Sequence, residues 1–247
     1  MTTRRGTLYG IGVGPGDPEL LTLKAHRLIT TTRVIAYPAP DTGESFARSI
    51  VSQWLDADKH EIAITIPMRV ERFPAKDVYD QAAIDIASHL ESDEDVVVLC
   101  EGDPFFYGSF MYLFERLAAS HTCEIVPGVS SLMASAAAAG RPLAARNDVL
   151  SVVAGPSEDA TIAHYLKQGD AIAIIKVGRH LARLRGLIEK AGLLDRAIYL
   201  ERVTLGEQKV MPLAQVGADA APYFSMILIY RGAESWIDNL PIAGDEM

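Results

Sequence analysis

The sequence predicts an α/β protein of two domains, because short apolar runs alternate with longer helical patterns along the chain. Several runs in the first half are apolar at successive positions, as strands of a parallel sheet covered on both faces require. The chain has 247 residues, 49% of them hydrophobic, which is enough for one large core or two smaller ones. Gly140 and Pro142 interrupt the alternation. We therefore expect an N-terminal domain over residues 1–145 and a C-terminal domain over residues 146–247.

The first half has the pattern of a mainly parallel open sheet with right-handed crossovers. Its short runs are rich in β-branched and aromatic residues, which favour strands. Strands are expected at residues 7–13, 33–38, 61–67, 95–100 and 123–127. Helices are expected between them at residues 18–31, 45–55, 76–90, 109–119 and 130–139.

The second half predicts a smaller α/β domain with a mixed sheet. Strands are expected within residues 149–155, 171–178, 197–203 and 223–232, and helices at residues 159–167 and 180–191. Residues 203–213 have the pattern of a strand pair or a β-loop rather than of a helix.

Composition excludes several classes of protein. The net charge of −9 and the isoelectric point of about 5.1 argue against sequence-independent binding of nucleic acid, which needs a basic face. No Cys/His cluster has the spacing of a metal site, and no stretch reaches the ~18 apolar residues of a membrane helix. Cys100 ends an apolar run and is expected in the core, and two cysteines in this chain suit a reducing compartment. With no apolar leader at the N-terminus, we expect a cytoplasmic protein.

A glycine-rich turn follows the first expected strand, with glycines at 10, 12, 14 and 16. A dinucleotide site needs G-x-G-x-x-G, so that the following helix faces a pyrophosphate. Here Pro15 removes an N–H donor from the turn, and Asp17 takes the helix N-cap where the phosphate would lie, with Pro18 at the first helical position. The acidic residue expected after the second strand is also missing. These features disfavour a dinucleotide-dependent oxidoreductase.

Two further loops follow strands in the same style. "EGDPFFYGS" begins at Glu101, and "PGVSS" ends at Ser131. Ligands of open α/β sheets bind beyond the carboxyl ends of strands, where all three loops are expected. Each loop alone would be an ordinary turn that uses Gly, Asp and Pro for its backbone geometry. The three together indicate a binding site.

These loops also resemble a known family. "GIGVGPGDPELLTLKA", "EGDPFFYGSF" and "VPGVSS" are similar to the signature loops of the tetrapyrrole methylases, which transfer methyl groups from S-adenosylmethionine to corrin precursors. The resemblance runs over nearly the whole chain and includes the two-domain layout. "YPAP", "GDPFFYGSF" and "PGVSSLMASAAAAGRPL" are most similar to the branch that methylates precorrin-2 at C20, which forms precorrin-3A in cobalamin biosynthesis. The resemblance also implies a homodimer.

The resemblance implies that S-adenosylmethionine lies in a cleft between the two domains. The first-domain contacts that it implies are Pro15, Gly102, Asp103, Phe106, Tyr107, Ser130 and Ser131. The second domain would add backbone contacts near Ala154, Val177, Val203 and Met226.

Methyl transfer to a meso carbon leaves a proton to be removed, so a nearby base is useful. Asp103, in a strand-end loop with aromatic neighbours, is the candidate base. The alternative role for Asp103, weighted equally, is only to hydrogen-bond the loop backbone or the cofactor. The carboxylates of a precorrin also call for a local cationic patch. Its candidates are Arg69, Arg72, Lys76, Arg146, Arg179 and Arg202, of which only some are expected to contact substrate.

Alternative functions remain open at this point. Within the family they are methylation of cobalt-factor II at C20, of uroporphyrinogen-III, of precorrin-4 or of diphthine, and ribosomal RNA methylation, against which the acidic charge counts. A non-enzymatic tetrapyrrole carrier is a further alternative. Nothing in the sequence distinguishes a metal-free substrate from a cobalt-bound one.

Overall fold

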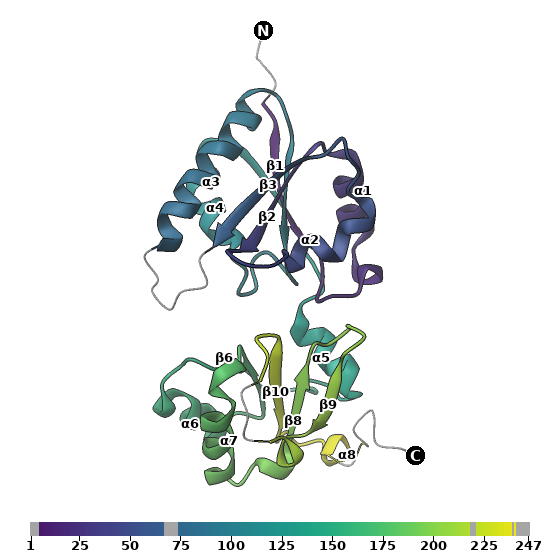
Figure 1. Ribbon diagram of the computed structural model, residues 1–247. Coiled ribbons are helices and arrows are strands. Elements are labelled where there is room, and N and C mark those ends of the chain that lie inside the picture. The colour runs from purple at the N-terminus through teal and green to yellow at the C-terminus, as the bar shows by residue number, and fades with distance from the viewer. Residues whose placement is uncertain (1–4, 67–73, 218–220, 239, 241–247) are drawn as a thin grey trace. The chain divides into compact units, whose positions relative to one another are not determined.

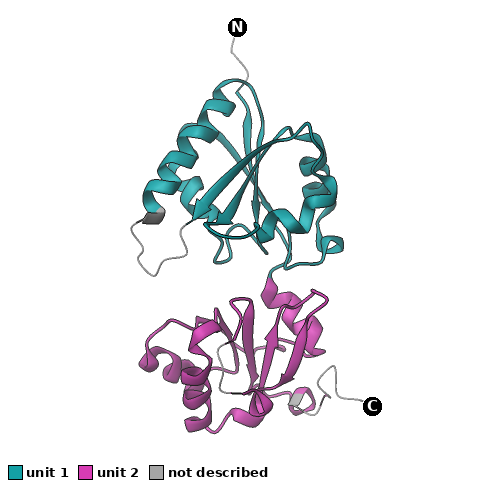
Figure 2. Ribbon diagram, in the orientation of Figure 1, with its two compact units in different colours: residues 1–130 teal, residues 131–247 magenta. Residues whose placement is uncertain are grey.

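A computed structural model describes residues 5–66, 74–217, 221–238 and 240 (Figure 1). The chain forms two compact units, residues 1–130 and residues 131–247 (Figure 2). Each unit contains one five-stranded sheet. The two-domain α/β fold predicted from the sequence is confirmed.

The first sheet is parallel throughout, with strand order β3-β2-β4-β1-β5. Its strands are β1 (Thr7–Gly12), β2 (Val34–Pro40), β3 (His60–Ile66), β4 (Val96–Cys100) and β5 (Thr122–Val126). They lie within one or two residues of the predicted ranges. Gly12 pairs with Cys100, so β1 and β4 end at the same level in the middle of the sheet.

Helices cover both faces of this sheet, as the apolar strands predict. Helices α1 (Leu23–Thr31) and α2 (Phe46–Val51) lie on one face, and α3 (Pro74–Glu91) and α4 (Phe110–Leu117) lie on the other (Figure 1). Along β4 the buried side chains alternate between the two cores, with Val97 facing α1 and α2, and Val98 facing α3 and α4. A strand buried on both faces needs apolar residues at every position.

The predicted helix at residues 18–31 is broken. Pro18–Leu20 forms a short 3₁₀ turn, η1, and α1 starts only at Leu23. Asp17 accepts a hydrogen bond from the Glu19 N–H at 2.8 Å and therefore caps the short turn. Thr22 caps the longer helix by accepting from the Ala25 N–H at 3.2 Å. The placement of Asp17 as the cap of the long helix was wrong, because Thr22 offers a second cap that satisfies α1.

The second sheet is mixed, as predicted, with strand order β6-β7-β10-β8-β9. Its strands are β6 (Leu150–Ala154), β7 (Ala171–Ile175), β8 (Ala197–Glu201), β9 (Lys209–Pro212) and β10 (Ser225–Tyr230). Only β6 and β7 pair in parallel, whereas β10 runs antiparallel to both β7 and β8. The segment expected as a strand pair or β-loop contributes the single edge strand β9, which pairs with β8.

Helices α6 (Asp159–Gln168) and α7 (Leu181–Lys190) share a core with one face of the second sheet. Helix α5 (Ser131–Ala139) contacts β8 and β10 of the same sheet, and the short α8 (Ser235–Asp238) brings Ile237 against Tyr230. Because α5 packs on the second sheet, the chain divides at residue 130, before the predicted boundary at 145.

Cys100 is buried in the first core, as predicted, and burial raises the pKa of its thiol. Both cysteines of the chain are free thiols. In the part of the chain that the structure describes, no helix has the length and apolar character needed to cross a membrane.

A bidentate ion pair ties α2 to the edge of the first sheet. Arg48 donates to the two carboxylate oxygens of Glu61 at 2.5 and 2.8 Å, and its guanidinium lies 5.9 Å from the Tyr37 ring centroid. The hydrogen bonds from Arg48 hold the pKa of Glu61 below its ordinary value. This pair links α2 to β3 through a half-buried contact of well-defined geometry.

We expect Glu61→Gln to lower the free energy of unfolding by about 1 kcal/mol near neutral pH, because a charged hydrogen-bonded pair is lost. The folded pKa of Glu61 lies below the unfolded value, so the stabilisation is full above the ordinary pKa of a glutamate. It disappears as pH falls through the folded value. Urea titrations between pH 3 and 7 would measure the difference in free energy of unfolding between the wild type and Glu61→Gln, which should shrink as pH falls. Glu44→Gln, at an exposed position, is the control. A difference that does not change with pH would contradict the account.

Candidate functional site

The carboxyl ends of β1 and β4 form a switch point in the first sheet. The two strands are neighbours, but the chain leaves β1 for α1 on one face and leaves β4 for α4 on the other (Figure 1). Such divergence opens a crevice at the sheet edge, and open α/β sheets bind ligands there. Two of the loops identified in the sequence start at this point. They are the glycine-rich loop after β1 and the loop after β4 that begins "EGDP" at Glu101, called the GDP loop below.

Backbone hydrogen bonds join these two loops. The Gly102 N–H donates to the Gly14 carbonyl at 2.8 Å, and the Gly14 N–H donates to the Gly102 carbonyl at 3.3 Å. The Val13 N–H donates to the Cys100 carbonyl at 2.9 Å. Gly14 and Gly102 have φ of +80° and +63°, in the left-handed region that glycine adopts freely.

Three glycines allow the loops after β1, β4 and β5 to touch. A Cβ on Gly12 would lie 2.5 Å from the Gly102 carbonyl oxygen and 2.5 Å from the Gly128 Cα. A Cβ on Gly128 would collide with the same carbonyl oxygen. Backbone atoms of the three loops come into direct contact, which explains why glycine is required at Gly12 and Gly128.

Asp103 holds the third loop to the second. One carboxylate oxygen accepts from the N–H groups of Phe105 and Phe106, at 2.9 and 3.1 Å. The other oxygen accepts from the Gly128 N–H at 3.1 Å. Both oxygens therefore serve the loop backbone, which is one of the two roles predicted for Asp103. Its role as the catalytic base stays a prediction.

Exposed apolar side chains follow Asp103 on the same loop and the first turn of α4. Tyr107 has φ of +57°, a strained value for a residue with a side chain, and is 45% exposed. The Phe106 ring packs edge-on against Tyr107, with centroids 5.2 Å apart. The exposed apolar side chains of this segment are Phe105, Tyr107, Met111 and Tyr112. They provide a surface that a large apolar ligand would cover.

Glu101 is a carboxylate of this edge that the sequence interpretation missed. It lies between Cys100, the last residue of β4, and Gly102, and its side chain reaches the surface. Neighbouring protein nevertheless removes part of its hydration, and this raises the pKa of Glu101. Its position directly before "GDP" at a predicted strand end was the signal available in the sequence.

The second sheet brings together the four cofactor positions expected there. Ala154 pairs with Ile175, which pairs with Met226 in the same register row. Val177 and Val203 follow β7 and β8 at the same edge of the sheet. Their contact with a cofactor, like that of Pro15, Ser130 and Ser131, stays a prediction, as does a cleft between the units.

Unusual backbone conformations gather at this edge of the second sheet. Lys176, Arg202 and Thr204 have φ of +56°, +49° and +72°, and Gly178 has φ of +40°. Side-chain-bearing residues in this region are strained, and such strain concentrates at functional sites. This strain could not be predicted from the sequence, because only one of these four residues is a glycine.

The cationic residues predicted in the second unit do not form one group. Arg179 lies in the 3₁₀ turn η3 (Gly178–His180) after β7 and is exposed, and Arg202 follows β8 and pairs with Glu207. Arg146 precedes β6 at the opposite edge of the sheet, and it pairs with Glu234 at 2.7 Å. A five-residue strand separates these edges by roughly 13 Å.

The remaining cationic candidates belong to the first unit. Lys76 is exposed on the first turn of α3. Arg69 and Arg72 lie outside the described residues.

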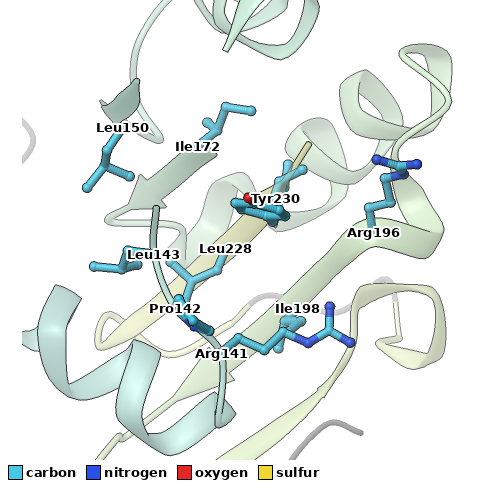
Figure 3. A pocket seen from close by; sticks show the side chains of 10 residues that line it. Arg141, Pro142, Leu143, Leu150, Ile172, Arg196, Ile198, Leu228 and Tyr230 are labelled. Carbon is cyan, nitrogen blue, oxygen red and sulfur yellow. The ribbon is translucent and has the colours of Figure 1, made fainter. Parts of the chain in front are cut away.

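A small cavity lies on the second sheet, near the starts of β6 and β8. Its volume is about 20 Å³, and Arg141, Leu150, Ile198, Leu228 and Tyr230 are among its lining residues (Figure 3). A space of this size holds little more than one water molecule. It is therefore not the binding site for a nucleoside or a macrocycle.

Comparison with known proteins assigns the chain to a family. Residues 7–216 match the family described as Tetrapyrrole (Corrin/Porphyrin) Methylases. The chain belongs to the tetrapyrrole methylases. The match covers the first sheet and the second sheet up to β9, so the resemblance extends well beyond the three loops.

Three relatives are 34–39% identical to this chain over the aligned residues. The precorrin-2 C(20)-methyltransferase of Sinorhizobium sp is 38% identical over 232 residues, which cover 91% of this chain and 95% of that protein. The cobalt-precorrin-2 C(20)-methyltransferase of Salmonella typhimurium is 34% identical, with 92% and 97% covered. The cobalamin biosynthesis protein CobIJ of Mycobacterium bovis is 39% identical over 92% of this chain, but the chain spans only 46% of its length.

The fold is also that of a solved tetrapyrrole methylase. The uroporphyrin-III C-methyl transferase of Thermus thermophilus, crystallised with S-adenyl homocysteine, superimposes with a TM-score of 0.66 at 22% identity. The superposition covers 92% of this chain and 98% of that one. The α/β fold of the tetrapyrrole methylases is therefore shared over nearly the full chain.

We expect Gly12→Ala to destabilise the protein by about 1–3 kcal/mol, because an added methyl forces the three loops apart. Thermal or urea unfolding would measure it. Gly186→Ala is the matched control: it lies within α7 with open space around the added methyl, and alanine there should stabilise by up to about 1 kcal/mol. Equal stability of both variants would contradict the loop convergence.

Proposed function

We propose that this protein is an S-adenosylmethionine-dependent methyltransferase that methylates precorrin-2 at C20 to give precorrin-3A in cobalamin biosynthesis. The structural observation that carries the proposal is the convergence of three loops at the switch point of the first sheet. The 38% identity to a precorrin-2 C(20)-methyltransferase, over 95% of that relative, supports the choice of substrate. The dinucleotide-dependent oxidoreductase is not favoured.

The residues present fit S-adenosylmethionine. Main-chain groups of the three loops lie at one sheet edge, where Glu101 and Asp103 place negative charge suited to a sulfonium cation. Strand-end backbone and the exposed Tyr107 ring offer contacts for the polar and planar parts of a nucleoside. When bound, S-adenosylmethionine supplies a methyl group that is already activated by its attachment to a positively charged sulfur.

The task of the chain is then to align the reactants and to exclude water. Holding two reacting groups in line can contribute about 7–11 kcal/mol to lowering a barrier. Loops that are held together through their backbones can keep the reactants aligned, because little side-chain rotation has to be restricted there. Exclusion of water removes a competing nucleophile.

The substrate is a large conjugated ring with carboxylates at its rim. The exposed aromatic and methionine side chains that follow Asp103 suit the ring, and arginines suit the rim carboxylates. Arg179 and Arg202 lie at the edge of the second sheet where the cofactor contacts are proposed, whereas Arg146 would have to bind from the opposite edge. Contacts from Arg69 and Arg72 are proposed from the sequence.

The proposal is tested by incubating the protein with S-adenosylmethionine and precorrin-2, with and without cobalt, and analysing the product by mass spectrometry. We expect one added methyl group, located at C20 by NMR. Calorimetry should show binding of S-adenosylmethionine and none of NAD. A protein that binds precorrin-2 without turnover would be a carrier, and methylation of another tetrapyrrole at a different carbon would also contradict the proposal.

We expect Arg179→Ala and Arg202→Ala to raise the KM for precorrin-2 several-fold, because a charged hydrogen bond to a carboxylate is removed. The effect should shrink at high salt, which screens exposed charges, while affinity for S-adenosylmethionine changes little. Arg33→Ala is the control, since Arg33 precedes β2 at the amino edge of the first sheet. Unchanged KM in both variants would show that the patch is misplaced.

We further propose a cytoplasmic homodimer that binds neither nucleic acid nor membrane. Two free thiols fit a reducing compartment, and the net charge of −9 disfavours nucleic acid. The dimer rests on the family resemblance alone. Light scattering of the purified protein would measure its mass in solution.

A further inference from the structure

Two carboxylates stand at the end of β4, and they differ in what surrounds them. Asp103 accepts three backbone hydrogen bonds that hold the GDP loop and the loop after β5. A carboxylate has about four acceptor positions, so a proton arriving at Asp103 would compete with the bonds that hold the site together. Both carboxylate oxygens of Asp103 are therefore used to hold the two loops together.

The Glu101 carboxylate is not used in this way. Among the described residues, its carboxylate has no hydrogen-bond partner or ion pair, and its side chain reaches solvent. It directly precedes Gly102, whose N–H and carbonyl pair with Gly14 across the switch point. Glu101 therefore lies next to the switch point in the chain, and its exposed carboxylate could pass a proton to water after each turnover.

We propose that Glu101 is a catalytic residue of the methyl transfer, acting as the general base that removes the proton from the methylated meso carbon. This assignment rests on the proposed function. In the reaction, a bond forms between the meso carbon and the methyl carbon, with electrons from the conjugated ring. The sulfur–methyl bond breaks and its electron pair stays on sulfur. The C–H electron pair then returns to the ring as the proton moves to the Glu101 carboxylate, and no oxidant or reductant is needed.

The surroundings of Glu101 suit this role. Partial loss of hydration raises the pKa of Glu101, which brings a carboxylate closer to the range where a general base is effective near neutral pH. The ionisable groups that interact with it are Cys100, the preceding residue, and Tyr79 on α3. Burial raises the pKa of both Cys100 and Tyr79, so neither competes for the proton near neutral pH.

The test compares Glu101→Gln with Asp103→Asn in the same assay, using precorrin-2 and S-adenosylmethionine with a labelled methyl group. We expect Glu101→Gln to lower kcat by 10²–10⁴-fold, the usual effect of losing a positioned base. Its affinity for S-adenosylhomocysteine, measured by calorimetry, should change less than about twofold. Glu101→Asp, which keeps a carboxylate one carbon further back, should give an intermediate kcat.

Asp103→Asn should behave differently. Asparagine replaces one acceptor oxygen with an amide that faces a backbone N–H, so the loops lose a contact. We therefore expect lower thermal stability and weaker binding of S-adenosylhomocysteine. Glu115→Gln, a 77% exposed side chain on α4, is the matched control and should keep wild-type kcat and affinity.

Two readouts separate a base from a merely structural residue. In the wild type, kcat should rise with pH through a midpoint above the ordinary pKa of a glutamate, and this rise should be absent in Glu101→Gln. In the ligand-free protein, the ¹³C signal of the Glu101 carboxyl, assigned by its loss in the variant, should titrate above the ordinary value.

If the wild type transfers no methyl to precorrin-2, the proposed function fails before any variant is compared. If the wild type is active and Glu101→Gln keeps a kcat within about threefold and an unchanged pH profile, the assignment of Glu101 is overturned. An ordinary or lowered titration midpoint of the Glu101 carboxyl would also overturn it.

Discussion

The site depends on the contact of three backbone segments at Gly12, Gly102 and Gly128. Each follows a strand of the first sheet, and no side chain fits between them. Asp103 closes the arrangement by joining the GDP loop to the loop after β5. Because β1 and β4 diverge to opposite faces, this contact lies at the crevice where a parallel sheet presents its strand-end backbone groups. Position, rather than any single reactive side chain, makes this edge the candidate site.

The second sheet forms its carboxyl edge in a different way. It uses few glycines at its carboxyl edge, and it places Lys176, Arg202 and Thr204 in left-handed conformations instead. The parallel strands β6, β7 and β8 end together there, and the first residues of β10 lie between β7 and β8. Strain of this kind persists only where surrounding structure enforces it, here a sheet whose β7, β8 and β10 are fully buried.

Local pattern in the sequence predicted most of the fold. Apolar runs located the strands of the first sheet, and the signal is continuous in β4, which is buried on both faces. Loop motifs identified the strand ends that form the site. Pairing order is a property of distant segments, so the sequence could not show that Arg146 lies at the other edge from Arg179. The break before α1 was missed because Asp17 and Thr22 are both good caps, and each caps an element of its own. Glu101 was missed because its desolvation arises from tertiary contacts.

Hydrogen–deuterium exchange with and without S-adenosylhomocysteine tests the central claim most directly, because it locates the ligand without any variant. The account predicts slower exchange of backbone amides in residues 12–16, 102–107 and 127–131 when the ligand is bound. These amides lie at the converging loops, and their protection should appear together. Binding that left all three segments unchanged, and protected amides around the small cavity near Arg141 and Ile198 instead, would contradict it.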